Sequence, residues 1–340
     1  MVQSYANEEF RIAKETSYGT LGGSPNWIIL KDIRLDPQAS FETEEFMASG
    51  DTAPSVSVVN DDFTVGSVAG KVGYNSAGYM LQSQFGAPET TTPGGATTAR
   101  QHDWEWDGRT PLVPVSYTGS HGIVGAADSI PGLIFNGFGI SGGRGGFDLT
   151  SAILGKAMSK GEELGGYVPA AGEDPAVDNA TVVPPVPVFP LHGSIFMDNT
   201  MAAVGTTRLL QVYDMGIDIG ERVARTRPIN ALRTSDGIVE TSDQEHTVSL
   251  QFGVDPVERA NFDAIRAGTF KFVRVQFEGN TIEASIKYLL RFDMCLAFRG
   301  VSAKEDSDSV LTRTWDTRIM RDPTSGVAMR IRLINTVTAY

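Results

Sequence analysis

An internal repeat is the sequence feature that most constrains this fold. The stretch Thr206–Phe252 has a copy at low identity 182 residues earlier, and the register holds for over sixty residues. At this spacing, Trp27–Asp36 aligns with Leu209–Asp218, and Gly86 aligns with Gly268. We interpret the repeat as a duplication, which predicts two similar halves in one chain.

Length and composition agree with an ordered, two-part protein. A chain of 340 residues is long for one core and comfortable for two domains of about 100–200 residues. Apolar residues make up 41% and charged residues 20%, as in ordered globular proteins. Val, Thr and Gly are prominent and helical periodicity is scarce, so we expect a mainly β fold. No apolar run is long enough to cross a membrane, the N-terminus lacks a signal-peptide pattern, and Cys295 is predicted to be buried.

The predicted domains are 1–160 and 191–340, joined by a Pro/Gly-rich linker at 161–190. The linker holds six of the 17 prolines and shows little periodicity. A Thr/Pro-rich insertion at about 87–111 interrupts the first domain. Each domain is expected to follow one plan, in which a strand, an extended arm, a strand and a short helix precede paired strands.

Two short helices are predicted from their start and stop signals. The first spans 75–85, with Asn75 or Ser76 as its N-cap and Gly86 as its stop. The second begins at the sequence Asp-Pro-Val-Glu, residues 255–258, in which the spacing of Asp and Glu forms a capping box. It ends at Gly268, the residue that aligns with Gly86.

A glycine-rich run formally matches the dinucleotide-binding pattern through Gly137, Gly139 and Gly142. That pattern needs a helix directly after the loop, and here more glycines and a strand-like run follow. We therefore predict an antiparallel hairpin that turns around Arg144. In the insertion, Trp104 and Trp106 share one strand face, which favours a half-buried strand over a base- or sugar-stacking site.

The charge pattern and the missing motifs narrow the function. The net charge is −13, and residues 1–186 hold 10 Lys and Arg against 22 Asp and Glu. Specific nucleic-acid binding is therefore not expected, whereas an acidic wall past which DNA slides is compatible with this charge. Phosphate-loop, nucleophile-elbow and zinc-protease motifs are absent, and the four histidines are scattered. No catalytic, cofactor-binding or metal-binding residue is predicted, so the chain is not expected to be an enzyme.

Three segments resemble the tail tube (major tail) proteins of long, flexible-tailed bacteriophages. They are 205–222 (GTTRLLQVYDMGIDIGER), 262–276 (FDAIRAGTFKFVRVQ) and 322–340 (DPTSGVAMRIRLINTVTAY). In the first half, NGFGISGGRGGFDLTSAILGKAM resembles the strand–turn–strand segment of this family. The insertion at 87–111 and the linker depart from the family pattern.

The resemblance implies two tandem tail-tube-like domains, each a β-sandwich or partial barrel with one flanking helix. It further implies a structural virion protein whose rings stack into the phage tail tube, the conduit for genome ejection. The implied partners are other copies of the chain, a tape measure protein, and tail terminator and baseplate proteins. The implied location is the phage tail, assembled in the host cytoplasm. A duplicated unit gives a pseudo-hexamer of three copies, with six copies as the alternative. The alternative function is a β-rich virion decoration or carbohydrate-binding module.

One narrower hypothesis concerns the arms at 37–51 and 219–233, which the repeat aligns. The first arm is acidic, and the second is basic. We expect these arms to pair between neighbouring copies or rings, with exposed ion pairs that set register more than strength. The residues assigned to this assembly role are Glu42, Glu44, Glu45, Arg222, Arg225 and Arg227.

Overall fold

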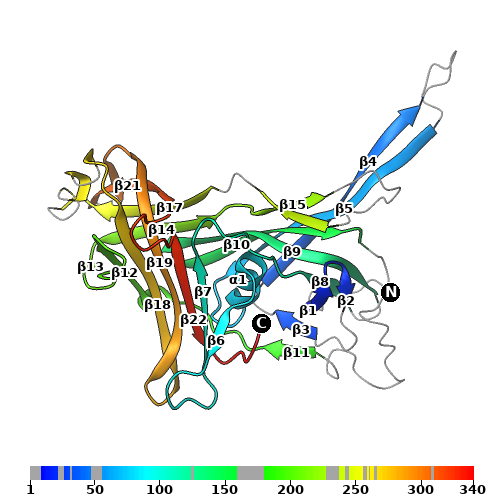
Figure 1. Ribbon diagram of the computed structural model, residues 1–340, viewed down its shortest axis with the longest axis horizontal. Coiled ribbons are helices and arrows are strands. Elements are labelled where there is room, and N and C mark those ends of the chain that lie inside the picture. The colour runs from blue at the N-terminus through cyan, green and yellow to red at the C-terminus, as the bar shows by residue number, and fades with distance from the viewer. Residues whose placement is uncertain are drawn as a thin grey trace.

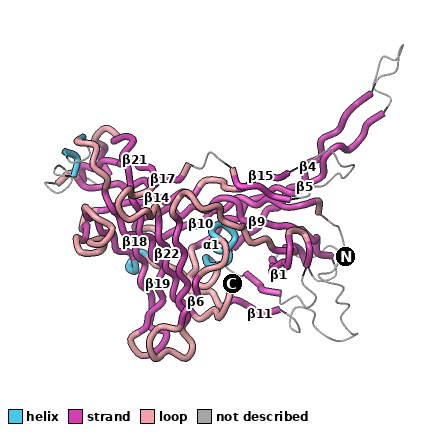
Figure 2. The backbone as a smooth tube through the Cα atoms, viewed as in Figure 1, coloured by secondary structure: helices cyan, strands magenta, loops and turns pink. Residues whose placement is uncertain are grey.

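The computed structural model shows a mainly β protein, as predicted (Figures 1 and 2). Twenty of its strands belong to one connected sheet network. The structure describes residues 9–21, 27–30, 33–46, 56–123, 126–158, 180–226, 237–241, 245–255, 259, 261–263, 266–307 and 310–340.

Seven strands of the first half form an unbroken antiparallel series. In order of pairing they are β2 (Thr20–Leu21), β1 (Glu9–Ser17), β8 (Tyr117–Ile123), β9 (Ala126–Gly143), β10 (Gly146–Lys156), β5 (Val56–Lys71) and β4 (Ile33–Phe46). The glycine-rich run becomes the β9–β10 hairpin, which turns at residues 144–145, so this prediction is confirmed.

The second half repeats the same series of pairings. Its strands are β13 (Arg208–Leu209), β12 (Gly193–Asp198), β18 (Lys271–Glu283), β19 (Ile286–Val301), β21 (Val310–Ile319), β17 (His246–Gly253) and β14 (Val212–Ile219). All six pairings are antiparallel and follow the same order along the chain as in the first half. This correspondence is the structural pattern that a duplication produces.

The helices occupy matching places in the two halves. Helix α1 (Ala77–Phe85) ends at Gly86, whose positive φ of 78° glycine adopts without strain. The first-helix prediction is confirmed, although the Ser76 side chain makes no capping hydrogen bond. In the second half, residues 259, 261–263 and 266 are helical, and Gly268 has a φ of 73°. Residues 256–258 of the predicted capping box lie outside the described residues.

The insertion at 87–111 crosses from the first half to the second. It forms β6 (Glu89–Thr91) and β7 (Arg100–Trp106), and β7 pairs with β22 (Met329–Asn335), which in turn pairs with β19. Across this pairing, the Arg330 side chain meets Glu105 at 2.8 Å and the Arg332 side chain meets Asp103 at 2.7 Å. The insertion is therefore a sheet extension that joins the halves.

The remaining strands are short. β3 (Trp27–Leu30) pairs with β1 and, in parallel, with β11 (Ala180–Val183), which lies within the predicted linker. β15 (Val223–Thr226) and β16 (Gly237–Glu240) form a separate ribbon, and β20 (Glu305–Ser307) pairs with β21. A 3₁₀ turn spans Pro190–His192.

The two halves share one core. Buried apolar side chains of both halves form one continuous cluster, in which Phe147 contacts Phe277 at a ring-centroid distance of 4.7 Å. The predicted units 1–160 and 191–340 are thus repeated halves of one folded body, and linker residues 161–179 lie outside the described residues. The long β4–β5 hairpin projects from this body at the upper right of Figure 1.

The loop before β7 is fastened by a carboxylate from the β18–β19 hairpin. The backbone N–H groups of Thr97, Thr98 and Ala99 all donate to Glu283, at 2.7–3.1 Å. These hydrogen bonds lower the pKa of Glu283 to about 2. Three convergent N–H groups make a cradle for one anion, which the chain fills with its own side chain.

We predict that Glu283→Ala will free this loop while leaving the fold intact. The amide protons of residues 97–99 should exchange with solvent at least about tenfold faster, because each loses its acceptor. The control is Glu278→Ala, which removes an exposed ion pair with Lys287 on the same hairpin. Equal exchange at residues 97–99 in both variants would show that the cradle does not hold the loop.

Candidate assembly interface

A ladder of backbone pairs between β9 and β14 joins the two halves into one sheet. Asp214 lies opposite Gly143, Ile217 opposite Ile140, and Ile219 opposite Phe138, in antiparallel register. On one face, Ile140, Ile217 and Ile219 are fully or almost fully buried in the shared core. The other face is polar and exposed, with Ser141, Asp148, Thr150, Asp214, Asp218 and Asp316 on adjoining strands.

Glycines on β9 allow its two neighbouring strands, β14 at Gly143 and β10 at Gly139, to approach closely. A Cβ on Gly143 would lie 2.3 Å from the Tyr213 carbonyl oxygen, and a Cβ on Gly139 would lie 2.6 Å from Thr150 Oγ1. Neither distance is tolerated by real side chains. Gly139, one of the glycines that resemble a nucleotide loop in the sequence, therefore serves close strand packing, as does the neighbouring Gly143.

Hydrogen bonds between the Asn136 side chain and the backbone of Arg222 and Val223 hold the end of this junction, and we call them the Asn136–Arg222 lock. Asn136 Oδ1 accepts hydrogen bonds from the backbone N–H groups of Arg222 and Val223, both at 3.0 Å. Asn136 Nδ2 donates to the Val223 carbonyl oxygen at 2.9 Å. Because all these groups are buried, the lock fixes the direction in which the chain leaves β14.

The Arg222 side chain extends from this lock into the core. Its guanidinium donates to Glu240 at 2.5 Å and to the Gln84 carbonyl oxygen at 3.1 Å, and it lies over the Phe85 and Trp106 rings. Burial lowers the pKa of Arg222, and Glu240 offsets part of this effect. Arg222 is only 2% exposed, so its charge is neutralised inside one chain.

Each half also has an open strand edge that corresponds to one side of this junction. In the first half, β4 takes the place that β14 takes in the second, and its pairing within the described residues is with β5 alone. In the second half, the end of β19 takes the place of the end of β9. Residues 297–301 pair with β21 on one side, and no described strand pairs with their other side. Each chain thus presents one open edge of each kind.

The predicted assembly residues have different outcomes. Glu42, Glu44 and Glu45 lie on β4, whose side chains are outside the described part of the chain, as is Arg227. Arg225 lies over the Phe63 ring of β5 at 3.4 Å, so β15 runs beside the projecting hairpin. Arg222 is buried, contrary to its expected place on an exposed arm. Its local sequence is polar, and only long-range contacts with Phe85, Trp106 and Glu240 reveal the burial.

The tryptophan pair is part of the fold. Trp104 is 5% exposed, and its Nε1 donates to the Gly86 carbonyl oxygen at 2.9 Å. The Trp106 ring contacts the His246 ring edge-on. The half-buried strand interpretation is confirmed, and Trp104 is not available as a sugar platform.

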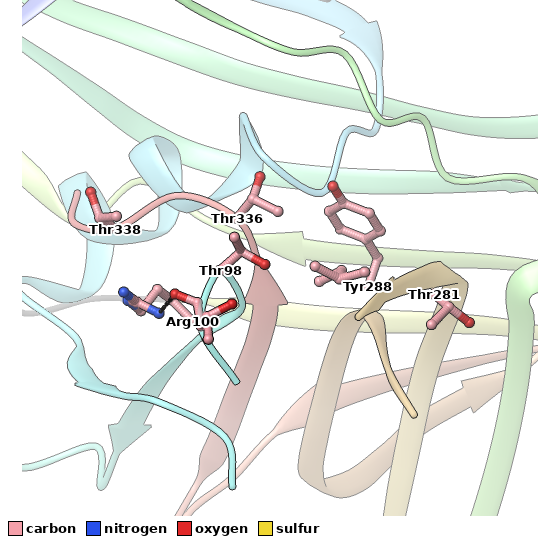
Figure 3. Close-up of a pocket in the computed structure, with 8 residues that line it drawn as sticks. Thr98, Arg100, Thr281, Tyr288, Thr336 and Thr338 are labelled. Carbon is pink, nitrogen blue, oxygen red and sulfur yellow. Dashed lines mark hydrogen bonds between the residues drawn. The ribbon is translucent and has the colours of Figure 1, made fainter. Parts of the chain in front are cut away.

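A surface hollow of about 420 Å³ lies beside the cradle of Glu283 (Figure 3). Five threonines, Arg100, Ile282 and Tyr288 line it, and Arg100 Nη1 is engaged by the carbonyl oxygens of Thr97 and Ala99. Figure 3 shows Thr281 and Thr338 at opposite ends of the hollow. The lining offers scattered hydroxyl groups without a convergent catalytic set.

Other site types find no support in the described part of the chain. No cluster of three or more His, Cys, Asp or Glu side chains there is arranged to hold a metal ion. Among the same residues, no helix is long and apolar enough to span a membrane. Comparison with protein-family models and with curated proteins finds no match.

We predict that Arg222→Met will destabilise the monomer by about 3 kcal/mol, because it removes the buried guanidinium group that pairs with Glu240 and with the Gln84 carbonyl group. Chemical denaturation measures this loss. The control is Arg299→Met, which removes an exposed pair with Glu245 and should cost under about 1 kcal/mol. Equal effects of the two substitutions would contradict a structural role for Arg222. An assembly test of the arm should therefore change Arg225 and Arg227 and leave Arg222 in place.

We also predict that the folded protein becomes less stable as the pH is lowered, because His246 is buried in its neutral form. Its Nδ1 accepts a hydrogen bond from the Gly220 N–H group, while Nε2 is buried without a partner. Burial, together with the charges of Arg222 and Arg318, lowers the pKa of His246 to about 4 from 6.5. Between these values the unfolded chain binds a proton that the folded chain does not. The free energy of unfolding should therefore fall by about 3 kcal/mol as pH drops from 6.5 to 4.

Nuclear magnetic resonance titration of the His246 ring checks this account, with denaturation at pH 7 and pH 5 alongside. The ring should stay neutral in the folded protein at pH 5. A His246 that titrates near 6.5 in the folded protein would contradict it.

Proposed function

We propose that this protein is a structural subunit of a phage tail tube, in which copies join edge to edge into a ring. One observation carries the proposal: the chain already contains one complete junction between its halves, and it presents the two edges that would form the same junction with other copies. β4 of one copy would pair with the end of β19 and with β20 of the next copy. β9 and β14 pair in the same antiparallel manner within the chain.

Such a contact is head-to-tail, so it closes only as a ring or continues as a helix. Three copies contribute six repeated halves, which is the pseudo-hexamer that the duplication favours. Closure also explains how the protein manages two exposed strand edges, which are otherwise sites of uncontrolled aggregation.

Pro37 is compatible with this junction. The repeat aligns Pro37 with Ile219, the last residue of β14 in the β9 ladder. A proline has no N–H group to donate, so its nitrogen is tolerated on the open side of an edge strand. The preceding residues of β4 are free of proline and align with the part of β14 that pairs with β9.

The exposed face of the joined sheet suits a channel wall. Its polar side chains include the carboxylates of Asp148, Asp214, Asp218 and Asp316. Asp148 pairs with Lys71 at 2.5 Å, and Arg318 lies on the same face. The carboxylates repel the phosphates of DNA, so the genome would pass without sticking. In this role the protein has no active site. Its partners are other copies of itself, the tape measure protein, and the terminator and baseplate proteins of the tail. The finished structure is the virion tail, built in the host cytoplasm.

The alternative role, a decoration or carbohydrate-binding module, now lacks its proposed residue. Trp104 is buried in the core. Tyr288 is the aromatic side chain that lines the hollow of Figure 3, and its ring packs against Tyr74 in a tilted arrangement. We therefore retain the assembly role.

We predict that Leu35→Pro will block tube assembly. In an antiparallel strand, backbone nitrogens alternate sides, so Leu35 shares the outward orientation that Pro37 requires. The substitution removes one donor from the open edge and spares the ladder with β5. Polymer yield, measured by sedimentation and electron microscopy, should fall at least about tenfold, because one interface hydrogen bond and its neighbours are lost.

Ala39→Pro is the matched control. Residue 39 has the same orientation but lies beyond the part of β4 that aligns with the β9–β14 ladder. Both variants should keep the circular dichroism of the wild type. The edge pairing is refuted if folded Leu35→Pro polymerises like the control.

A further inference from the structure

A second hollow, of about 300 Å³, lies where three separate segments meet. The end of β7, the end of β21 and the start of β22 form its walls, and Glu240 of β16 closes one side. Its lining is mainly polar and includes the three arginines Arg109, Arg318 and Arg321 beside Trp106. Three guanidinium groups around so small a hollow are a concentration of positive charge on an otherwise acidic chain.

The neighbouring carboxylates make their hydrogen bonds to other groups, while the charge of Arg321 still acts on Asp107 and Asp322. Glu240 accepts a hydrogen bond from Arg222 at 2.5 Å. Asp107 is engaged in its own turn by the N–H groups of Arg109 and Thr110 and by the Thr110 hydroxyl group, all at 2.7–2.8 Å. Asp322 likewise accepts from backbone N–H groups of the turn that follows it.

The turn that follows Arg321 leaves room for its guanidinium group. Gly326 has a φ of 76°, and a Cβ there would lie 3.0 Å from Arg321 Nη2, so the absent side chain makes room for the guanidinium. The Gly326 N–H group donates to the Asp322 carbonyl oxygen, and the Asp322 N–H group donates to the Val327 carbonyl oxygen, which fixes the turn.

The guanidinium groups of Arg109 and Arg321 make no hydrogen bond to another described residue, and Arg321 Nε is enclosed without a partner. The charge of Arg318 also acts on His246, which lies outside the hollow. Besides burial, the charges of Arg222 and Arg318 lower the pKa of the nearby His246. An enclosed donor without an acceptor is costly, and a bound anion would satisfy it.

We propose that this hollow binds a tetrahedral oxyanion, specifically a phosphate group, through the guanidinium groups of Arg109 and Arg321. Planar guanidinium forks match phosphate oxygens in pairs, and such charge-assisted hydrogen bonds are strong and short. Arg318 adds positive charge at the wall, which Trp106 also lines. The phosphate comes either from free inorganic phosphate or from a phosphodiester backbone. This inference does not depend on the tube proposal, because it rests on the hollow alone.

Isothermal titration of the full chain with inorganic phosphate tests the proposal. We expect saturable binding to the wild type that weakens at least about tenfold in Arg109→Gln/Arg321→Gln, because both forks are lost. The control Arg144→Gln/Arg208→Gln removes the same charge from two exposed arginines outside the hollow and should bind like the wild type. Thermal unfolding checks that both double variants remain folded.

A second titration with a short single-stranded oligonucleotide distinguishes the two sources. Binding that is lost in Arg109→Gln/Arg321→Gln and kept in the control assigns the site to a phosphodiester. Phosphate binding without oligonucleotide binding assigns it to free phosphate. The proposal is overturned if the wild type shows no saturable phosphate binding up to about 20 mM, or if the two double variants bind equally.

Discussion

The backbone ladder between β9 and β14 is the interaction on which the rest of this structure depends. It turns two repeated strand series into one sheet, and it buries Ile140, Ile217 and Ile219 in a shared core. Its geometry requires a residue without a side chain where β14 comes closest to β9, and Gly143 is that residue. A duplicated unit with separate cores would leave both edges open, whereas this ladder satisfies one edge of each half and leaves the other two for neighbours.

Two further devices keep the halves from sliding. The insertion of the first half adds β7 to the sheet of the second, where charged pairs such as Arg332 with Asp103 match across the strands. The Asn136–Arg222 lock holds the chain as it leaves the ladder, and it does so with buried polar groups that are all satisfied by protein partners. Rigid halves in one body suit a subunit that must present two edges at a fixed angle. The carboxylates of the exposed face fit the same role, because they repel the phosphates of DNA.

Local chemistry made much of this fold predictable. Glycine stops at 86 and 268 located the ends of both helices, and the glycine-rich run correctly indicated a hairpin because no helix could follow it. The spacing of the repeat aligned the matching helices. Predictions were incomplete where contacts join distant segments. Nothing within 87–111 encodes its pairing with β22, and nothing within 219–233 distinguishes the buried Arg222 from exposed arginines. The arginine hollow was missed for the same reason, since its three cations come from two segments about 200 residues apart in sequence, Arg109 on one side and Arg318 and Arg321 on the other.

The central claim is that the junction inside the chain is repeated between chains. A symmetry measurement by electron cryomicroscopy of the assembled protein tests it most directly. The account predicts stacked rings of three copies, in which β4 of each copy pairs antiparallel with residues 297–307 of its neighbour. A protein that stays monomeric beside a tail initiator complex would contradict the account, and so would rings in which those two edges face solvent.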